Sequence, residues 1–175
     1  MTQPTDSATS AKPLWTPSQS QINASRLAHY QQWLERHYGV PRGEYADLWQ
    51  WSVDNLESFW TSIWEYFDVQ AGGSNQPVLA SHAMPDAQWF PNATLNYAEH
   101  IFRNATDQRP ALIARNETSE PYEVSWADMQ RDAGALAAGL RKLGIGKGDR
   151  VVSYLPNRPE TVVAFMACAS LGAVW

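Results

Sequence analysis

The stretch Leu143-GIGKGDRVV, which ends at Val152, combines three glycines with a lysine and is the first candidate for a phosphate-binding loop. Such loops offer backbone N–H groups to phosphate oxygens when they follow a strand and open a helix. Here the expected order is reversed, because an apolar helical pattern comes first and a valine-rich strand pattern follows. The spacing G-x-G-x-G also matches neither G-x-x-x-x-G-K-[ST] nor G-x-G-x-x-G. We therefore interpret Gly144 as a helix C-cap and the loop as a turn, with Ile145 packing back on Leu140.

The other reactive side chains do not form a catalytic or metal-binding pattern. His29 and His37 are too far apart for one metal ion, which favours helical ligands at i and i+4, and His82 and His100 have no ligand at suitable spacing. The single cysteine, Cys168, lies in an apolar run and cannot form an internal disulfide, which is typical of a reducing compartment. None of the serines considered as nucleophiles lies in a G-x-S-x-G elbow: Ser81, Ser125, Ser153 and Ser170. The carboxylates Glu57, Glu65 and Asp68 fit the polar side of a helix, and no pair of them indicates general acid/base catalysis. We predict no catalytic, cofactor-binding or metal-binding residue in this chain.

The composition is that of an ordinary folded protein, with 44% hydrophobic and 18% charged residues in 175. The net charge of -5 leaves no basic stripe, so we expect no nucleic-acid partner. The N-terminal segment lacks both the apolar core of a secretory signal and arginine. The longest apolar run, 161–175, is shorter than the ~20 residues that cross a bilayer. We expect a cytoplasmic protein with no membrane partner.

The N-terminal part of the chain is predicted to be helical. A first helix is predicted after the N-cap Asn23 and ends before Gly39. A second is predicted after Asp54, which forms a capping-box pair with Glu57. A third is expected from Pro91 to Phe102, because proline suits the first turn of a helix.

From Pro110 the pattern changes to alternating strands and helices. Strands are predicted at 111–114, 122–126 and 150–155, and a further strand begins at 173. Ser125 caps a helix whose buried face is expected to comprise Met129, Ala133, Leu136, Ala137, Leu140 and Leu143. Pro159 opens a second helix that is apolar on nearly all sides and therefore requires burial. This alternation predicts an α/β fold with a parallel sheet.

Tryptophan is concentrated in the helical part, which holds seven of the nine: Trp15, Trp33, Trp49, Trp51, Trp60, Trp64 and Trp89. One interpretation is aromatic packing of a small layer that has little aliphatic core. The other is a docking surface for another domain. The two are compatible, and the sequence leaves both open.

Two stretches together resemble a known family. WFPNATLNYAEHIF (89–102), preceded by YADLWQWSVDNLESFWTSIWEYFDV (45–69), resembles the N-terminal region of AMP-forming acyl-CoA synthetases of the acetyl-/acetoacetyl-CoA branch. The pattern WFP-x-A-x-LNYAE is most similar to the acetoacetyl-CoA synthetases. VSWADM and CASLGAVW, within 124–175, resemble the start of the adenylation domain. Composition and the change of pattern near residue 105 divide the chain into three parts: a Pro-, Ser-, Thr- and Gln-rich tail (1–21) that we expect to be disordered or draped over another surface, a helical part (22–105) and an α/β part (106–175). The resemblance implies that the second part is an acetyl-CoA synthetase-type N-terminal domain and the third the truncated start of an AMP-binding domain.

The resemblance implies a ligase that joins acetoacetate to CoA with ATP and Mg, in lipid and ketone-body metabolism. In the family, the phosphate loop, the nucleotide-binding motifs, the acid pocket and the catalytic lysine all lie downstream of the segment matched here. Lys147 matches the turn position and not the catalytic lysine, so no family site residue is carried over. We therefore expect an N-terminal fragment that is inactive alone and binds no cofactor. The alternatives are a fragment of an acetyl- or propionyl-CoA synthetase, and a non-catalytic, aromatic-rich interaction module.

Overall fold

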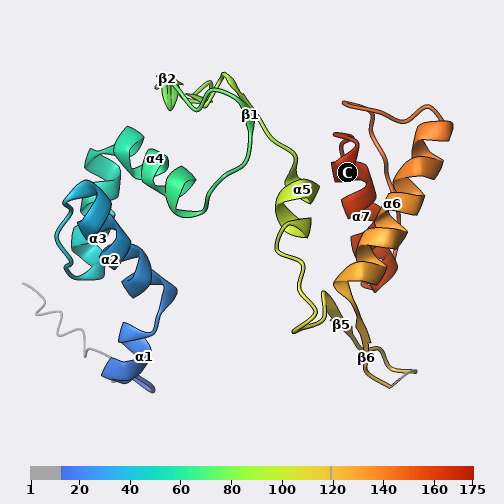
Figure 1. Cartoon of the computed structure of the whole chain (residues 1–175), viewed down its shortest axis with the longest axis horizontal. Helices are drawn as coiled ribbons and strands as arrows, with labels where there is room; N and C mark the ends of the chain where they lie inside the picture. Colours follow the sequence, from blue (N-terminus) through green and yellow to red (C-terminus); the bar gives the residue numbers. More distant parts are fainter. Residues whose placement is uncertain (1–12, 119) are drawn as a thin grey trace, which may run out of the picture. The chain divides into compact units, whose positions relative to one another are not determined.

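The computed structural model describes residues 13–118 and 120–175 and contains two compact units, one up to Asp68 and one from Val69 (Figure 1). The predicted tail lies outside the described residues over 1–12, and its remainder leads into a short helix. The boundaries at 21/22 and 105/106, drawn from composition and pattern, remain predictions.

Over residues 13–68, the first unit contains four helices: α1 (Gln19–Asn23), α2 (Arg26–Tyr38), α3 (Tyr45–Asp54) and α4 (Leu56–Tyr66). The prediction that Asn23 caps the first long helix is wrong, because Asn23 is the last residue of α1. The cap of α2 is Ser25, whose hydroxyl accepts a hydrogen bond from the Ala28 backbone N–H at 3.1 Å. Gly39, with φ 66°, ends α2 as predicted, because the left-handed conformation suits glycine.

Helix α3 was not predicted, and the proposed cap Asp54 is its last residue. Its own N-terminus carries an acidic capping box, in which the Glu44 N–H donates to the Asp47 carboxylate at 2.9 Å. The next residue, Asn55, precedes α4 but makes no side-chain cap hydrogen bond. Glu57 does lie in the first turn of α4, where a negative charge is favourable.

The core of the first unit is mainly aromatic. Tyr30, Leu34 and Leu48 are buried at its centre. Trp33 packs edge-on to Tyr66, with ring centroids 5.5 Å apart. The interpretation of the tryptophans as packing residues therefore applies to Trp33, whereas Trp49 is 53% exposed.

The second unit begins with two small antiparallel pairs, β1 (Gly72–Gly73) with β4 (Ala93–Thr94) and β2 (Leu79–Ser81) with β3 (Gln88–Trp89). The pairing of β4 contradicts a helix starting at Pro91. Helix α5 is Tyr97–Phe102 and is capped by Asn96, whose side chain accepts from the Glu99 N–H at 3.2 Å. Residues 93–94 are extended because they pair with the glycine strand, and the helix can begin only beyond them.

The remaining elements follow the predicted order. Strands β5 (Leu112–Ala114) and β6 (Tyr122–Val124) form an antiparallel hairpin, and helices α6 (Trp126–Lys142) and α7 (Pro159–Ser170) lie side by side (Figure 1). The Ser125 hydroxyl caps α6, accepting from the Asp128 N–H at 3.0 Å. The buried core is formed by Ala98, Met129, Ala133 and Met166. The predicted inner face of α6 is wrong at Leu136 and Leu143, which are exposed because no described element covers them.

The predicted strand over 150–155 is present at only one point. Arg150 forms a parallel bridge with Val174, and the Val151 N–H donates to the Val174 carbonyl at 2.8 Å. Beyond it, Val152 and Tyr154 are exposed. A strand requires a hydrogen-bonding neighbour along its length, and Val174 is the one pairing residue that the described chain supplies. The single bridge has the parallel sense expected for the opening of an α/β domain.

Candidate functional site

The glycine loop after α6 is a helix C-cap. Gly144 has φ 89°, its N–H donates to the Arg141 carbonyl at 3.0 Å, and the Ile145 N–H donates to the Leu140 carbonyl at 3.0 Å. These two bonds are the pair that defines a Schellman motif. The C-cap prediction is confirmed in its hydrogen bonds.

The rest of the loop directs its backbone donors into the protein. The Gly146 N–H donates to the Asp149 carboxylate at 2.8 Å, and the Gly148 N–H donates to the Gly172 carbonyl at 3.0 Å. A phosphate cradle needs these N–H groups to be free for the anion. The loop therefore connects α6 to the bridge at Arg150 and offers no nucleotide site in this conformation.

Lys147 lies against the end of α7. A β-carbon added at Gly172 would meet the Lys147 Cγ at 3.3 Å, so the lysine stem fills the space beside that glycine. Gly172 also has φ 70°, which favours glycine. The position of Lys147 is explained by this packing, in agreement with its interpretation as a turn residue.

Three of the four histidines have hydrogen-bond partners within the protein. His29 Nδ1 is 2.7 Å from the Tyr66 hydroxyl, and His37 Nδ1 is 2.8 Å from the Trp33 carbonyl, one turn back on the same helix. His100 Nε2 lies 2.9 Å from the Gln70 carbonyl and 3.0 Å from its N–H. Over residues 13–118 and 120–175, no group of three or more His, Cys, Asp or Glu side chains could hold a metal ion.

The thiol and the serine hydroxyls are held in structural roles. Cys168 is fully buried, and burial raises the pKa of its thiol, which keeps it protonated and a poor nucleophile. The Ser170 hydroxyl donates to the Ala167 carbonyl at 2.7 Å, and the Ser81 hydroxyl accepts from the Ala83 N–H at 3.2 Å. Burial and a hydrogen bond to the Glu65 carboxylate, in that order, raise the pKa of Tyr38 to about 12.

Asn96 joins two helices that are distant in sequence, a role that the sequence did not reveal. Besides capping α5, its side-chain amide donates to the carbonyls of Ala169 at 3.1 Å and Ser170 at 3.2 Å, at the end of α7. The Asn96 side chain thus forms hydrogen bonds with backbone groups that lack a partner within their own helix, an N–H at the start of α5 and carbonyls at the end of α7. The available signal was its position between a strand pattern and a helical pattern, where asparagine favours a cap.

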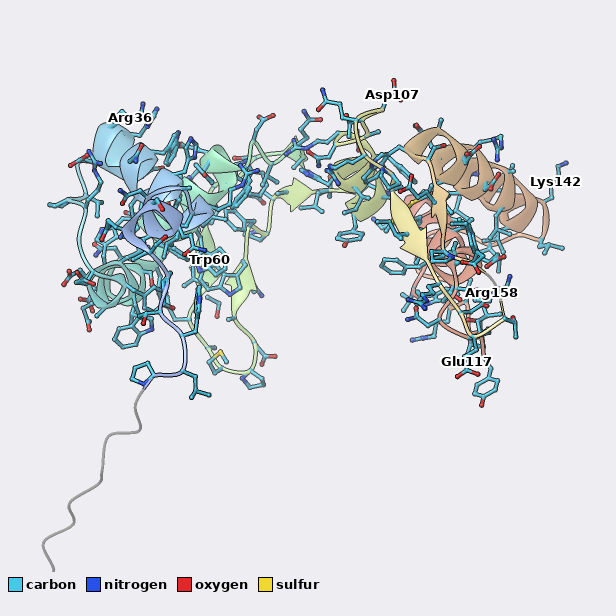
Figure 2. All side chains as sticks on the ribbon, turned by 90° about the horizontal axis from the view of Figure 1, so that it is seen from below. Arg36, Trp60, Asp107, Glu117, Lys142 and Arg158 are labelled. Carbon is cyan, nitrogen blue, oxygen red and sulfur yellow. The ribbon has the colours of Figure 1, made fainter. Side chains whose placement is uncertain are left out.

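Charged side chains lie on the surface of both units. Figure 2 labels Arg36 near the end of α2 and Lys142 at the end of α6, where positive charge suits the helix C-terminus. The ion pair between Arg42 and Glu35, at 2.6 Å, is also exposed. Within the described part of the chain, no helix has the length and apolar character that crossing a bilayer requires.

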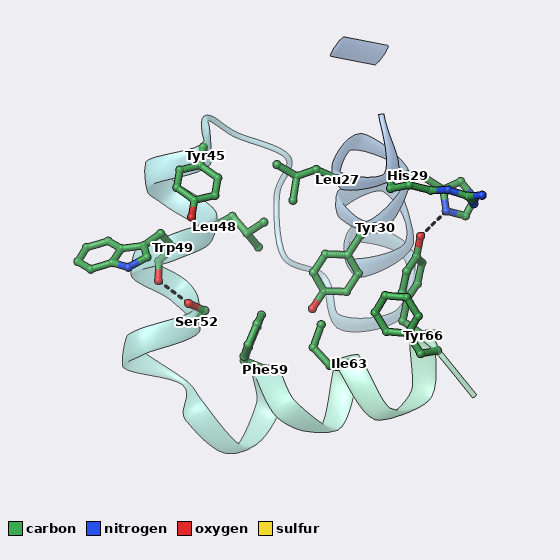
Figure 3. A pocket seen from close by; sticks show the side chains of 12 residues that line it. Leu27, His29, Tyr30, Tyr45, Leu48, Trp49, Ser52, Phe59, Ile63 and Tyr66 are labelled. Carbon is green, nitrogen blue, oxygen red and sulfur yellow. Dashed lines mark hydrogen bonds between the residues drawn. The ribbon is translucent and has the colours of Figure 1, made fainter. Parts of the chain in front are cut away.

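An apolar groove with a volume of about 780 Å³ lies between α2, α3 and α4 (Figure 3). The volume lies in the range of ligand pockets, which is about 300–1,000 Å³. It was not anticipated from the sequence, because one of its three walls is the unpredicted helix α3. His29 and Ser52 line the groove but do not pair with each other: His29 Nδ1 is 2.7 Å from the Tyr66 hydroxyl, and the Ser52 hydroxyl donates to the Trp49 carbonyl at 2.7 Å.

Comparison with known proteins matches both halves of the chain to one kind of enzyme. Residues 45–101 match the family described as acetyl-coenzyme A synthetase N-terminus, and residues 100–175 match the family described as AMP-binding enzyme. The solved acetoacetyl-CoA synthetase from Streptomyces lividans is similar with a TM-score of 0.89 and 48% identity. That match covers 94% of this chain and 26% of the other.

Curated relatives agree with the structural match. Acetoacetyl-coenzyme A synthetase of Rhizobium meliloti is 35% identical over 164 residues, and acetoacetyl-CoA synthetase of Danio rerio is 36% identical over 168 residues. Each match covers 94% of this chain and 25% of the relative. The chain therefore spans about a quarter of the length of the curated relatives it matches.

Proposed function

Because this chain belongs to the AMP-forming acyl-CoA synthetases, we propose that it is the N-terminal part of an enzyme that converts acetoacetate, ATP and CoA to acetoacetyl-CoA, AMP and diphosphate. The observation that carries the proposal is the 48% identity to a solved acetoacetyl-CoA synthetase across 94% of this chain. The proposed location is the cytoplasm, and the proposed setting is lipid and ketone-body metabolism.

In the proposed reaction, the acid carboxylate attacks the α-phosphorus of ATP, and diphosphate leaves as the acyl-adenylate forms. The CoA thiol then attacks the acyl carbon, and AMP leaves. ATP, Mg²⁺ and CoA are thus ligands of the whole enzyme. Two observations support placing the phosphate and Mg²⁺ contacts elsewhere: the Gly146 and Gly148 N–H groups donate within the protein, and no group of three or more His, Cys, Asp or Glu side chains among the described residues could hold a metal ion.

The proposed role of this segment is to supply the first layer of the adenylation fold. Asn96 ties α5 to the end of α7, and the bridge between Arg150 and Val174 sets the direction of the first parallel strand pair. The segment thereby fixes where the next strand leaves the helix layer. We place the reacting groups outside residues 1–175.

Acetoacetate-dependent exchange between ATP and diphosphate tests the proposal. We expect no exchange for the 175-residue chain, and exchange for the polypeptide encoded when the gene is read on past the Trp175 codon. Exchange by the 175-residue chain alone would contradict the assignment of the chemistry to other segments. A longer polypeptide that contains the family's phosphate-loop motif but lacks exchange with any acid would contradict the proposed function.

The second candidate changes only the acid. The match of residues 45–101 to an acetyl-coenzyme A synthetase N-terminus favours acetate or propionate as the alternative. Exchange rates of the longer polypeptide with acetoacetate, acetate and propionate at equal concentration separate these. We expect acetoacetate to give the highest rate, and a preference for acetate or propionate would replace acetoacetate as the substrate.

A further inference from the structure

The groove in the first unit has a buried and pre-formed floor. Tyr30, Leu48, Phe59 and Ile63 point toward one another between the three helices (Figure 3). Tyr30 is only 6% exposed, and its hydroxyl is fixed by a 2.6 Å hydrogen bond to the Ser62 hydroxyl. Because the floor is held by the core of the unit, the groove does not need an occupant to form.

The rim of the groove is apolar and uncovered. Leu27, Tyr45, Trp49 and Phe67 line it, with exposed fractions of 40%, 68%, 53% and 56%. These side chains come from α2, α3 and the residue that follows α4, so an occupant would touch each wall. Covering them removes apolar surface from water, which favours binding of an apolar group.

The charge at the groove is opposite to that of the unit around it. Residues 13–68 contain seven carboxylates and three arginines, yet none of the carboxylates lines the groove. Arg26 does line it, together with His29, whose Nδ1 is already engaged by Tyr66. An acidic unit thus presents its apolar groove with a cation and no anion.

Arg26 also differs from the other two arginines of this unit. Arg36 donates to the Gln32 carbonyl at 3.1 Å, and Arg42 pairs with Glu35. No side-chain hydrogen bond or ion pair of Arg26 is found to any residue in 13–118 or 120–175. The guanidinium is therefore available to an anionic group at the mouth of the groove.

We propose that this groove is a binding site for a linear carboxylate with an apolar chain, the chemistry of a fatty-acid anion. The hydrocarbon chain of the ligand lies over Leu48, Phe59 and Ile63, and its carboxylate faces Arg26. The volume of about 780 Å³ accommodates such a molecule, and ligand pockets commonly combine an apolar lining with a few polar groups that fix orientation. The site is distinct from the proposed synthetase chemistry and does not depend on it.

Octanoate and 1-octanol are the matched probes, because they share the chain and differ in charge. Calorimetric titration of the 175-residue protein, without ATP or CoA, is expected to show saturable octanoate binding. Arg26→Gln should weaken octanoate binding about two- to fivefold, as expected for an exposed charge pair, and leave octanol binding unchanged. Arg36→Gln is the matched control on the same helix and should change neither affinity.

Trp49→Ala removes part of the apolar rim and should weaken both probes. Since Arg26 and Trp49 are both exposed, circular dichroism should show unchanged helix content in both variants. No saturable binding of octanoate by the unaltered chain would overturn the proposal, as would equal effects of Arg26→Gln and Arg36→Gln. Sedimentation that shows a stable dimer closing the groove, which octanoate fails to dissociate, would assign the groove to a second copy instead.

Discussion

The hydrogen bond between Tyr30 and Ser62 makes a quantitative prediction about the core of the first unit. Both side chains are buried, Ser62 completely, and their hydroxyl oxygens are 2.6 Å apart. The Ser62 hydroxyl also lies 2.6 Å from the Phe59 carbonyl, which can only accept. The single Ser62 proton therefore goes to Phe59, and Tyr30 must be the donor to Ser62. Burial raises the pKa of Tyr30, so this donor stays protonated at neutral pH.

The two partners are consequently not equivalent. Ser62→Ala leaves the Tyr30 hydroxyl buried without an acceptor, and an unsatisfied buried polar group costs about 1–3 kcal/mol. Tyr30→Phe removes the donor but leaves the bond from Ser62 to Phe59 intact, which costs about 0.5–1.5 kcal/mol. In the double variant the orphaned hydroxyl is gone, so its cost should be smaller than the sum of the two single changes by about 1 kcal/mol.

Urea unfolding followed by tryptophan fluorescence measures these differences, because six of the nine tryptophans lie before Asp68. Ser52→Ala is a suitable control, since the Ser52 hydroxyl is exposed and donates only to the Trp49 carbonyl one turn back. We expect that control to change the free energy of unfolding by less than about 0.5 kcal/mol. If Tyr30→Phe costs more than Ser62→Ala, or if the two changes are additive, the assigned direction of the hydrogen bond is wrong.

Three further predictions concern pH, a helix junction and glycine. The pKa of Tyr38 is raised from 10.0 to about 12 in the folded chain, so the contribution of Tyr38 to stability is complete below pH 10 and is lost as pH rises toward 12. Urea unfolding at pH 8 to 11.5 should show this loss of stability, and the Tyr38→Phe variant should not show it. Asn96→Asp keeps the N-cap acceptor but places a carboxylate against the last carbonyls of α7, so we expect a loss of about 1–2 kcal/mol; unchanged stability would contradict the link between α5 and α7. Gly73→Ala should destabilise the chain by about 1–3 kcal/mol, because Gly73 has φ 83° and an added β-carbon would overlap the backbone carbonyl of Asn92, just before β4. Gly134→Ala, at an exposed helical site with open space, should instead stabilise it by about 0.5–1 kcal/mol, and equal effects of the two glycine changes would refute the steric argument.

The elements that sequence reasoning identified correctly are those with local end signals. Ser125 caps α6 as predicted, Pro159 opens α7, and Gly39 ends α2. In each case the signal and the helix end lie within one turn, so the backbone requirement is visible in the sequence itself. The α/β class followed from the order of these elements.

The elements that were missed depend on partners distant in the chain or on less common caps. Helix α3 begins with a capping box of Glu44 and Asp47, in which an acid replaces the usual serine or threonine. The pair of β1 with β4 has two residues in each strand, too short for any alternation to be read. The late start of α5 at Tyr97 is a consequence of that pairing, and it could not be derived before the pairing was known.

The features of the candidate site also divide into those that local sequence signals predict and those that depend on distant partners. The glycine loop shows why. That the loop is a turn could be derived locally, because helix-before-strand order already fixes which way its N–H groups face. The structure adds that the donors are used: Gly144 and Ile145 close α6, Gly146 binds the Asp149 carboxylate, and Gly148 binds the end of α7. A phosphate could use the Gly146 and Gly148 N–H groups only if their bonds to Asp149 and Gly172 broke, and loss of the bond to Gly172 would remove a contact next to the bridge between Arg150 and Val174. The loop therefore holds the first parallel strand pair in place, and the same glycines that imitate a nucleotide site are unavailable to a nucleotide for that reason.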